Sequence, residues 1–333
     1  MIKIIVDAYG GDNSPLVNVK GCVKCLNNLN DVEIILVGKE NELTALLSDY
    51  EYDKSRLSIL NADEIITCDD KPTDAIKHKK NSSLVKAFEL LRESDDINAM
   101  VSVGSTGAIL AGAVLRVGRI KGVKRPGFCP ILPTMNHKIV GVCDSGANVD
   151  CDAHQLQQFA IMGSAYLEAA YNIKSPRVAL LNVGTESEKG DLLRKETYEL
   201  LLKTPSINFV GNMESRDLLS GKYDLIVCDG FSGNVLIKST EGACLEMLKL
   251  LKHTFTKGFK NKLGALLLKK DIYEIKDFMD YNNYGGAVLL GTTKTIVKGH
   301  GSSKEEAIYQ CLVQAYNMEK NNLRDKIAEE VTK

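Results

Sequence analysis

The sequence predicts an α/β protein built on a mostly parallel, multi-layer sheet. Short apolar segments rich in Val and Ile alternate with amphipathic segments, and most of the apolar ones end at glycine and polar residues. Strands that are apolar at nearly every position are typical of sheets covered on both faces. The alternation itself is typical of βαβ units with right-handed crossovers. Of the 333 residues, 44% are hydrophobic and 26% charged, as in globular proteins that bury a core.

The elements follow one another along the whole chain. Strands are predicted at Ile2–Asp7, Val32–Val37, Leu57–Asn61, Ala99–Val103, Ile139–Asp144, Val178–Val183, Ile207–Val210 and Leu225–Asp229. Amphipathic helices are predicted between them, at Ser83–Arg92, Asp152–Tyr171 and Gly190–Lys203. Because no repeat or low-complexity linker divides the chain, we expect a single two-lobed domain over residues 1–333, with a helical arm inserted at 243–280.

Charge and composition exclude several classes of protein. The net charge of −1 gives no global basic field for nucleic acid. No apolar run approaches the roughly 18 residues of a membrane span, and the first apolar run is too short for a signal peptide. An odd number of scattered cysteines, nine in all, predicts free thiols in a cytoplasmic protein. Cys22 and Cys25 form a CxxC without a second pair, so we interpret them as two small residues on one helix face.

Five predicted strands end in loops that combine glycine with Asp, Asn, Ser or Thr. These loops are Asp7–Asp12, Gly104–Ala108, Asp144–Asp150, Asn182–Glu186 and Asp229–Asn234. We expect them on one edge of the sheet, where parallel α/β sheets bind ligands. Glycine lets a backbone approach a ligand and helix N-termini attract anions, so the pattern predicts phosphate binding. The sequence contains neither GxxxxGK[ST] nor a GxGxxG after the first strand, which argues against a nucleotide P-loop and a standard dinucleotide site.

Titratable residues gather at the same predicted strand ends. Asp144, Asp150 and Asp152 suit either a metal site or helix capping, and we expect no metal. No GxSxG elbow supports serine hydrolase chemistry. His300, between two glycines, is either part of a turn or an anion-binding general acid, and Lys238 either forms a surface ion pair or holds phosphate.

Residues 247–270 form a basic and apolar segment with seven lysines and no acidic residue. We expect one helix, a turn near Gly264 and a second helix. Such a segment suits an anionic membrane surface or an acidic protein, or else it is a solvated helix face. The residues expected to make these contacts are Lys260, Lys262, Leu263, Leu266, Leu267 and Leu268. A second basic segment, Arg116–Arg125, also suits an acidic partner.

Eight short motifs, taken in order along the chain, resemble the bacterial phosphate acyltransferase family, the acyl-ACP:phosphate transacylases of phospholipid synthesis. They are DAYGGD at 7–12, GSTGA at 104–108, DSGANVD at 144–150, NVGTE at 182–186, GNME at 211–214, CDGFSGN at 228–234, YGGA at 284–287 and HGSS at 300–303. Each motif is weak alone, but their shared order is specific.

The resemblance implies transfer of a fatty acyl group from acyl carrier protein (ACP) to inorganic phosphate, without a cofactor. It also implies an α/β/α sandwich like that of isocitrate and isopropylmalate dehydrogenases, with a protruding helical arm. The expected partners are ACP, phosphate, a membrane glycerol-3-phosphate acyltransferase, an anionic membrane surface and a second copy of the chain, with no nucleic acid. The expected location is the cytoplasm, with peripheral membrane association.

Within this reaction we assign roles to individual residues. Lys238, His300 and Asn148 are expected to be catalytic, with Asn148 or His300 at the oxyanion. Asp7, Gly10, Gly11 and Asp12 are expected to organise loops. The residues expected to bind phosphate or substrate are Gly104, Thr106, Gly107, Asp144, Gly184, Asp229, Gly230, Gly233 and Asn234.

Three other functions fit parts of the pattern. A short-chain phosphate acyltransferase would use acyl-CoA in place of acyl-ACP. A decarboxylating dehydrogenase of the same fold would need a metal and a nicotinamide cofactor. A scaffold that binds ACP or membrane without catalysis would not need five glycine-rich strand ends.

Overall fold

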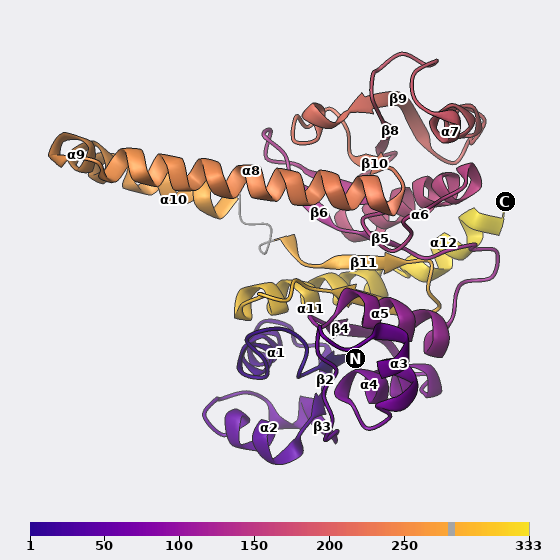
Figure 1. Ribbon diagram of the computed structural model, residues 1–333. Coiled ribbons are helices and arrows are strands. Elements are labelled where there is room, and N and C mark those ends of the chain that lie inside the picture. The colour runs from indigo at the N-terminus through magenta and orange to yellow at the C-terminus, as the bar shows by residue number, and fades with distance from the viewer. Residues whose placement is uncertain (279–283, 333) are drawn as a thin grey trace.

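The computed structural model describes residues 1–278 and 284–332, which contain two sheets (Figure 1). A seven-stranded sheet has the order β3-β2-β1-β4-β12-β11-β5, and a five-stranded sheet has the order β6-β7-β10-β8-β9. The strands are β1 (Ile2–Asp7), β2 (Val32–Gly38), β3 (Leu57–Asn61), β4 (Ile97–Ser102), β5 (Gly127–Cys129), β6 (Ile131–Pro133), β7 (Ile139–Cys143), β8 (Arg177–Asn182), β9 (Asn208–Glu214), β10 (Leu225–Val227), β11 (Ala287–Leu290) and β12 (Thr295–Lys298).

Helices connect and cover these strands. They are α1 (Leu16–Asn28), α2 (Glu40–Leu47), α3 (Pro72–His78), α4 (Ser83–Glu93), α5 (Thr106–Gly112), α6 (Ala153–Tyr171), α7 (Leu192–Leu202), α8 (Gly230–Thr256), α9 (Phe259–Leu267), α10 (Lys269–Phe278), α11 (Glu305–Lys320) and α12 (Leu323–Thr332). Short helical turns are η1 (Lys54–Arg56), η2 (Ala113–Val117) and η3 (Ser215–Asp217).

Three buried clusters give the α/β/α layering that the sequence predicts. The largest takes residues from both sheets and packs them against α1, α6 and α11. A second lies between the other face of the seven-stranded sheet and α3, α4 and α5. A third covers the outer face of the five-stranded sheet. Burial of these apolar side chains drives the assembly, at about 25 cal/mol per Å².

The strand pairings are mostly parallel, as predicted, with β11 and β6 as the antiparallel exceptions. The expectation that five glycine-rich loops share one edge is wrong, because the strands divide between two sheets. The carboxyl ends of β1, β4 and β12 meet at one edge, and those of β7, β10 and β8 meet at another. Only Pro130 separates β5 from β6, so the chain passes directly from one sheet to the other.

Helix α8 leaves the body of the molecule and carries α9 at its far end, which makes the protruding arm that we expected (Figure 1). The predicted turn near Gly264 is wrong, because the chain turns at Lys257 and Gly258 instead. Gly264 lies within α9 among good helix formers, where one glycine costs only about 1 kcal/mol. The predicted end of the arm at residue 280 falls outside the described residues.

Cys22 and Cys25 lie on one buried face of α1, and both are free thiols. This agrees with their interpretation as small residues of a helix. Burial raises the pKa of the Cys25 thiol to about 12, which keeps it protonated and unreactive.

Candidate active site

The buried carboxylate of Asp7 organises the edge of the seven-stranded sheet. Ser102 at the end of β4 donates a 2.7 Å hydrogen bond to Asp7 Oδ2, and the same hydroxyl accepts the N–H of Gly104 at 3.1 Å. The N–H of Tyr9 donates to Asp7 Oδ1. Asp7 therefore ties the loop after β1 to the loop after β4. The N–H of Gly104 is used inside this network, and its expected role in binding phosphate stays a prediction.

Glycines at this edge allow backbone segments to cross. A Cβ on Gly10 would lie 2.6 Å from the nitrogen of Gly104. Gly11 has φ +90 and approaches Val103 and Gly301, so a side chain there would be both strained and overpacked. The N–H of Asp12 donates to the carbonyl of Gly301 at 2.8 Å. The loops after β1, β4 and β12 thus lie against one another.

Helix α5 begins directly at this edge with open backbone donors. Ser105 occupies its N-cap position but makes no capping hydrogen bond with its side chain. The first N–H groups of a helix have no partner within it, so those of Thr106 and Gly107 remain available at its positive end. A Cβ on Gly107 would lie 2.7 Å from Pro72 Cγ. The absence of a side chain at Gly107 therefore allows α3 to pack closely against α5.

His300 lies in the loop after β12 with a defined ring orientation. The N–H of Ser302 donates to its Nδ1 at 3.3 Å, and the Ser302 hydroxyl lies 2.8 Å from the same nitrogen. Nδ1 is therefore an acceptor, which places the hydrogen of the neutral ring on Nε2. Burial and the charges of Lys298 and Lys238 lower the pKa of His300, while Asp12 acts in the opposite direction.

Two lysines from different elements lie within electrostatic range of one another and of His300. Lys238 is exposed on α8, and Lys298 is partly buried at the end of β12. Burial is the main factor that lowers the pKa of Lys298; Lys238 lowers it further, while Glu241 of α8 raises it. Burial also raises the pKa of Glu241, against the effect of both lysines. Lys238 and Glu241, about three turns into α8, are therefore within electrostatic range of Lys298 at the carboxyl end of β12.

The edge of the five-stranded sheet is organised by a second carboxylate, that of Asp144. Its Oδ1 accepts the N–H groups of Phe128 at 2.9 Å, Ser145 at 2.6 Å and Ala147 at 3.2 Å. Its Oδ2 accepts the N–H of Asn148 at 2.7 Å and the side-chain amide of Asn148 at 3.0 Å. Burial raises the pKa of Asp144, and these donors act in the opposite direction. This fully buried group is surrounded by its own loop and β5, which gives it a role in organising the loop, and its expected role in binding substrate stays a prediction.

The side-chain amide of Asn148 is held by two acceptors. Its Nδ2 donates to the carbonyl of Pro126 at 2.8 Å as well as to Asp144. Both amide hydrogens are engaged in this way, and the catalytic role expected of Asn148 stays a prediction. Asp152 caps α6 in a capping box with Gln155, which settles its alternative roles in favour of helix capping.

Asp229 caps α8 and anchors it to α7. Its Oδ1 accepts the N–H of Ser232 at 2.8 Å, and its Oδ2 accepts the Ser232 hydroxyl at 2.9 Å. Arg194 of α7 forms an ion pair with the same Oδ2, and the two side chains are 14% and 8% exposed. Asp229 therefore fixes the start of α8, and its expected role in binding substrate stays a prediction.

The glycines of this segment bring α8 against the Asp144 loop. The N–H of Gly230 donates to the carbonyl of Asn148 at 2.7 Å, and its expected contact with phosphate stays a prediction. A Cβ on Gly230 would lie 2.6 Å from that carbonyl oxygen, and a Cβ on Gly233 would lie 1.9 Å from the carbonyl oxygen of Asp144. These glycines permit contact between two backbones, and the expected ligand contact is not required to explain them.

The predicted site residues thus fall into two groups. Asp12, Thr106, Gly107, Lys238 and His300 lie around the edge of the seven-stranded sheet. The second group surrounds the start of α8 and consists of Asp144, Asn148, Asp229, Gly230, Gly233 and Asn234. Asn234 lies beside Gly146. Gly184 follows β8, and the nearest atoms to a Cβ there belong to Glu186 and Lys189 of its own loop.

Sequence reasoning missed four residues that shape these two edges: Ser102, Arg194, Glu241 and Lys298. Lys298 carried a usable signal, because it directly precedes the Gly-His-Gly segment at the end of an apolar run. Arg194 and Glu241 lie inside helices and gave no comparable signal.

The described residues hold no group of three or more His, Cys, Asp or Glu side chains that suits a metal ion. Within 1–278 and 284–332, no helix combines the length and apolar character needed to cross a membrane.

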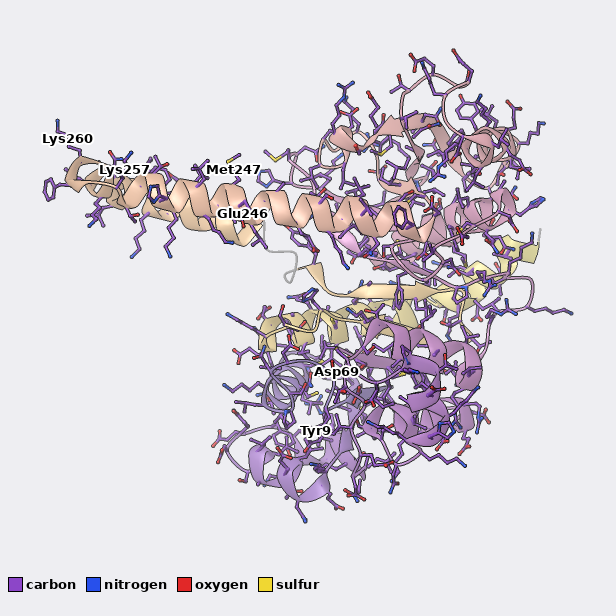
Figure 2. The ribbon with its side chains drawn as sticks, in the orientation of Figure 1. Tyr9, Asp69, Glu246, Met247, Lys257 and Lys260 are labelled. Atoms are coloured by element: carbon purple, nitrogen blue, oxygen red, sulfur yellow. The ribbon has the colours of Figure 1, made fainter. Side chains whose placement is uncertain are left out.

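The arm exposes both its apolar and its basic residues. Leu263, Leu266, Leu267 and Leu268 of the predicted set are 52%, 66%, 80% and 47% exposed. Phe259, the first residue of α9, is 84% exposed. Lys257 and Lys260 lie at the free end of the arm, far from Tyr9 in the body of the molecule (Figure 2).

Solved structures with the same architecture define the class of protein. The chain is similar to a phosphotransacetylase from Streptococcus pyogenes, with a TM-score of 0.62, 17% identity and coverage of 96% of this chain and 94% of the other. It is also similar to a branched-chain phosphotransacylase from Enterococcus faecalis, with a TM-score of 0.58, 14% identity and coverage of 95% and 98%. The fold is therefore that of the phosphotransacylases.

Sequence relatives narrow this class to one family. A family model described as "Fatty acid synthesis protein" matches residues 2–326. The chain is 44% identical over 332 residues to a phosphate acyltransferase of Dictyoglomus thermophilum, covering 100% of this chain and 98% of the relative. It is 45% identical over 334 residues to a phosphate acyltransferase of Streptococcus uberis, with the same coverage. The chain belongs to the phosphate acyltransferase family and is an acyltransferase of lipid biosynthesis.

Proposed function

We propose that this enzyme transfers a long-chain fatty acyl group from the thioester of acyl-ACP to inorganic phosphate, giving acyl phosphate for phosphatidic acid synthesis. The observation that carries the proposal is the cluster of Lys238, Lys298 and His300 at the edge where α5 presents open N–H groups. Cations and helix N-termini are the groups that bind phosphate in proteins.

The chemistry requires positioning rather than a protein nucleophile. A phosphate oxygen attacks the thioester carbonyl carbon, and the carbon–sulfur bond breaks with its electron pair going to sulfur. The proton of HPO₄²⁻ passes to that sulfur, so the products are the acyl phosphate dianion and a free thiol. Holding phosphate beside the carbonyl supplies most of the catalysis. The hydrogen on His300 Nε2 suits donation to the oxyanion of the tetrahedral intermediate.

The positive charge of residues 247–270 supports ACP as the carrier of the acyl donor and a membrane surface as the location of the enzyme. ACP is acidic, and the lysines of residues 247–270 would attract it or an anionic membrane surface. The exposed leucines of α9 would enter the interfacial region of a bilayer. The proposal therefore includes a cytoplasmic enzyme with peripheral membrane association, and a membrane glycerol-3-phosphate acyltransferase that uses the product. It also includes a homodimer.

The direct test measures phosphate-dependent release of free thiol from palmitoyl-ACP, with palmitoyl-CoA and acetyl-CoA in parallel and no added metal. Release from palmitoyl-ACP, together with formation of acyl phosphate, is expected. Release from the CoA thioesters alone would identify the short-chain alternative. A folded sample that releases thiol from none of them would refute the transacylase assignment.

A separate test addresses the arm. Leu266→Ser combined with Leu267→Ser is expected to weaken sedimentation with vesicles containing phosphatidylglycerol, because two exposed apolar side chains are lost. Leu192→Ser is the matched control, since this leucine is 86% exposed on α7. Undiminished vesicle binding by the double variant would contradict a membrane role for α9.

A further inference from the structure

Two lysines at opposite ends of β12 differ in what surrounds their ammonium groups. Lys294 Nζ donates to the carbonyls of Ser94 at 2.9 Å and Ile97 at 2.8 Å, and to Asn98 Oδ1 at 2.9 Å. Its three hydrogens are thus satisfied by the protein. Within residues 1–278 and 284–332, Lys298 Nζ has no hydrogen bond and no ion pair within 4.0 Å. Lys294 therefore stabilises the fold, whereas the N–H donors of Lys298 can bind a ligand.

The strand register shows where Lys298 points. It pairs with Ser102 of β4, and two positions earlier Ile296 pairs with Met100. Ile296 and Met100 belong to the buried cluster that packs against α5. Because side chains alternate along a strand, Lys298 and Ser102 face that same side of the sheet. The Lys298 side chain therefore lies on the face from which α5 begins.

The surroundings of Lys298 favour an anion. Lys238 of α8 and His300 lie close enough to interact with it electrostatically, and Glu241 is the neighbouring carboxylate. Removing a lysine from water without a partner costs free energy, and a bound anion recovers part of it. An ammonium that is already desolvated also needs little reorganisation when the anion arrives.

We propose that Lys298 is a catalytic residue, whose ammonium holds the attacking phosphate at the carboxyl end of β12. The proposal rests on the proposed function, since phosphate is the nucleophile there. Lys298 stays protonated throughout: it neutralises phosphate charge while the oxygen attacks carbon, and the proton that reaches the leaving sulfur comes from HPO₄²⁻. Lys238 on α8 is the second cation within electrostatic range of this anion.

The test compares K298M with K304M in steady-state assays that vary inorganic phosphate at saturating palmitoyl-ACP. Lys304 is exposed at the start of α11, so K304M removes a nearby positive charge without touching the site. K298M is expected to raise the KM for phosphate about 10- to 100-fold, the usual effect of losing a charge-assisted hydrogen bond. The KM for palmitoyl-ACP is expected to stay within twofold, and K304M to match the wild type. A KM for phosphate within twofold of wild type in K298M would overturn the proposal.

A binding measurement separates this proposal from the function on which it rests. Calorimetric titration with inorganic phosphate needs no acyl donor, and K298M is expected to bind at least tenfold more weakly than wild type and K304M. If wild type releases no thiol from palmitoyl-ACP, the proposed function fails, and this titration still decides the role of Lys298. If K298M does not fold, K298Q replaces it, because glutamine keeps a polar group of similar length. The KM for phosphate and the calorimetric affinity for phosphate are then measured for K298Q and judged by the same limits. Equal phosphate affinity in K298Q and wild type would overturn the proposal.

Discussion

Gly233→Ala tests whether close backbone contact holds α8 in place. The new Cβ would lie 1.9 Å from the carbonyl oxygen of Asp144, so the helix or the loop must move by more than an ångström. Overpacking of this kind costs about 1–3 kcal/mol, and distortion of the donors around Asp144 adds about 1–2 kcal/mol. Alanine recovers about 1 kcal/mol through helix propensity. The expected net loss is about 3 kcal/mol, with loss of activity as Lys238 is displaced.

Gly242→Ala on the same helix is the matched control, because nothing lies within 4 Å of a Cβ at that position. It is expected to stabilise the protein by about 0.5–1 kcal/mol and to preserve activity. Urea unfolding followed by circular dichroism gives both free energies, and the thiol-release assay gives both activities. If Gly233→Ala and Gly242→Ala had equal unfolding free energies, the contact between α8 and the Asp144 loop would not constrain the enzyme.

Three further outcomes are expected. Arg194→Met leaves a buried carboxylate unpaired at the start of α8 and should cost about 3–5 kcal/mol in urea unfolding; a loss below 1 kcal/mol would contradict this. Lys238→Met removes a charge that lowers the pKa of His300, so the NMR titration midpoint of that ring should rise, and an unchanged or lower midpoint would refute the coupling. N-ethylmaleimide should modify exposed Cys68 in the native protein and Cys25 only after unfolding, as peptide mass spectrometry would show; native labelling of Cys25 would contradict its burial.

Much of the fold could be predicted because buried parallel strands have a strong local signature. The boundaries of β1 and β3 agree with the prediction, and α4 and α6 differ from it by one residue at one end. The four strands β5, β6, β11 and β12 were missed, since each has only three or four residues and lies among glycines, prolines or threonines. Sheet membership was also missed, because an apolar run does not indicate which strands pair.

The site was harder to predict because glycine has two uses that look identical in a sequence. At Gly230 and Gly233 it admits another backbone, whereas sequence reasoning assigned it to a ligand. Asp144 was similarly ambiguous, since a carboxylate that accepts five donors of its own loop and of β5 resembles one that binds substrate. The sequence places Lys298 just before the Gly-His-Gly segment, but the face of the sheet to which it belongs became clear only from the register of β12.

Helix α8 couples the arm to the site mechanically. Its 27 residues run without interruption, so it is a rod of about 40 Å at 1.5 Å per residue. The contacts of Gly230 and Gly233 with the Asp144 loop fix one end of this helix to the body of the molecule. A 5° tilt about that point would move the far end by about 3.5 Å but Lys238, about 12 Å along the rod, by only about 1 Å. A small tilt of α8 therefore moves the tip of the arm by several ångströms while Lys238 stays nearly still.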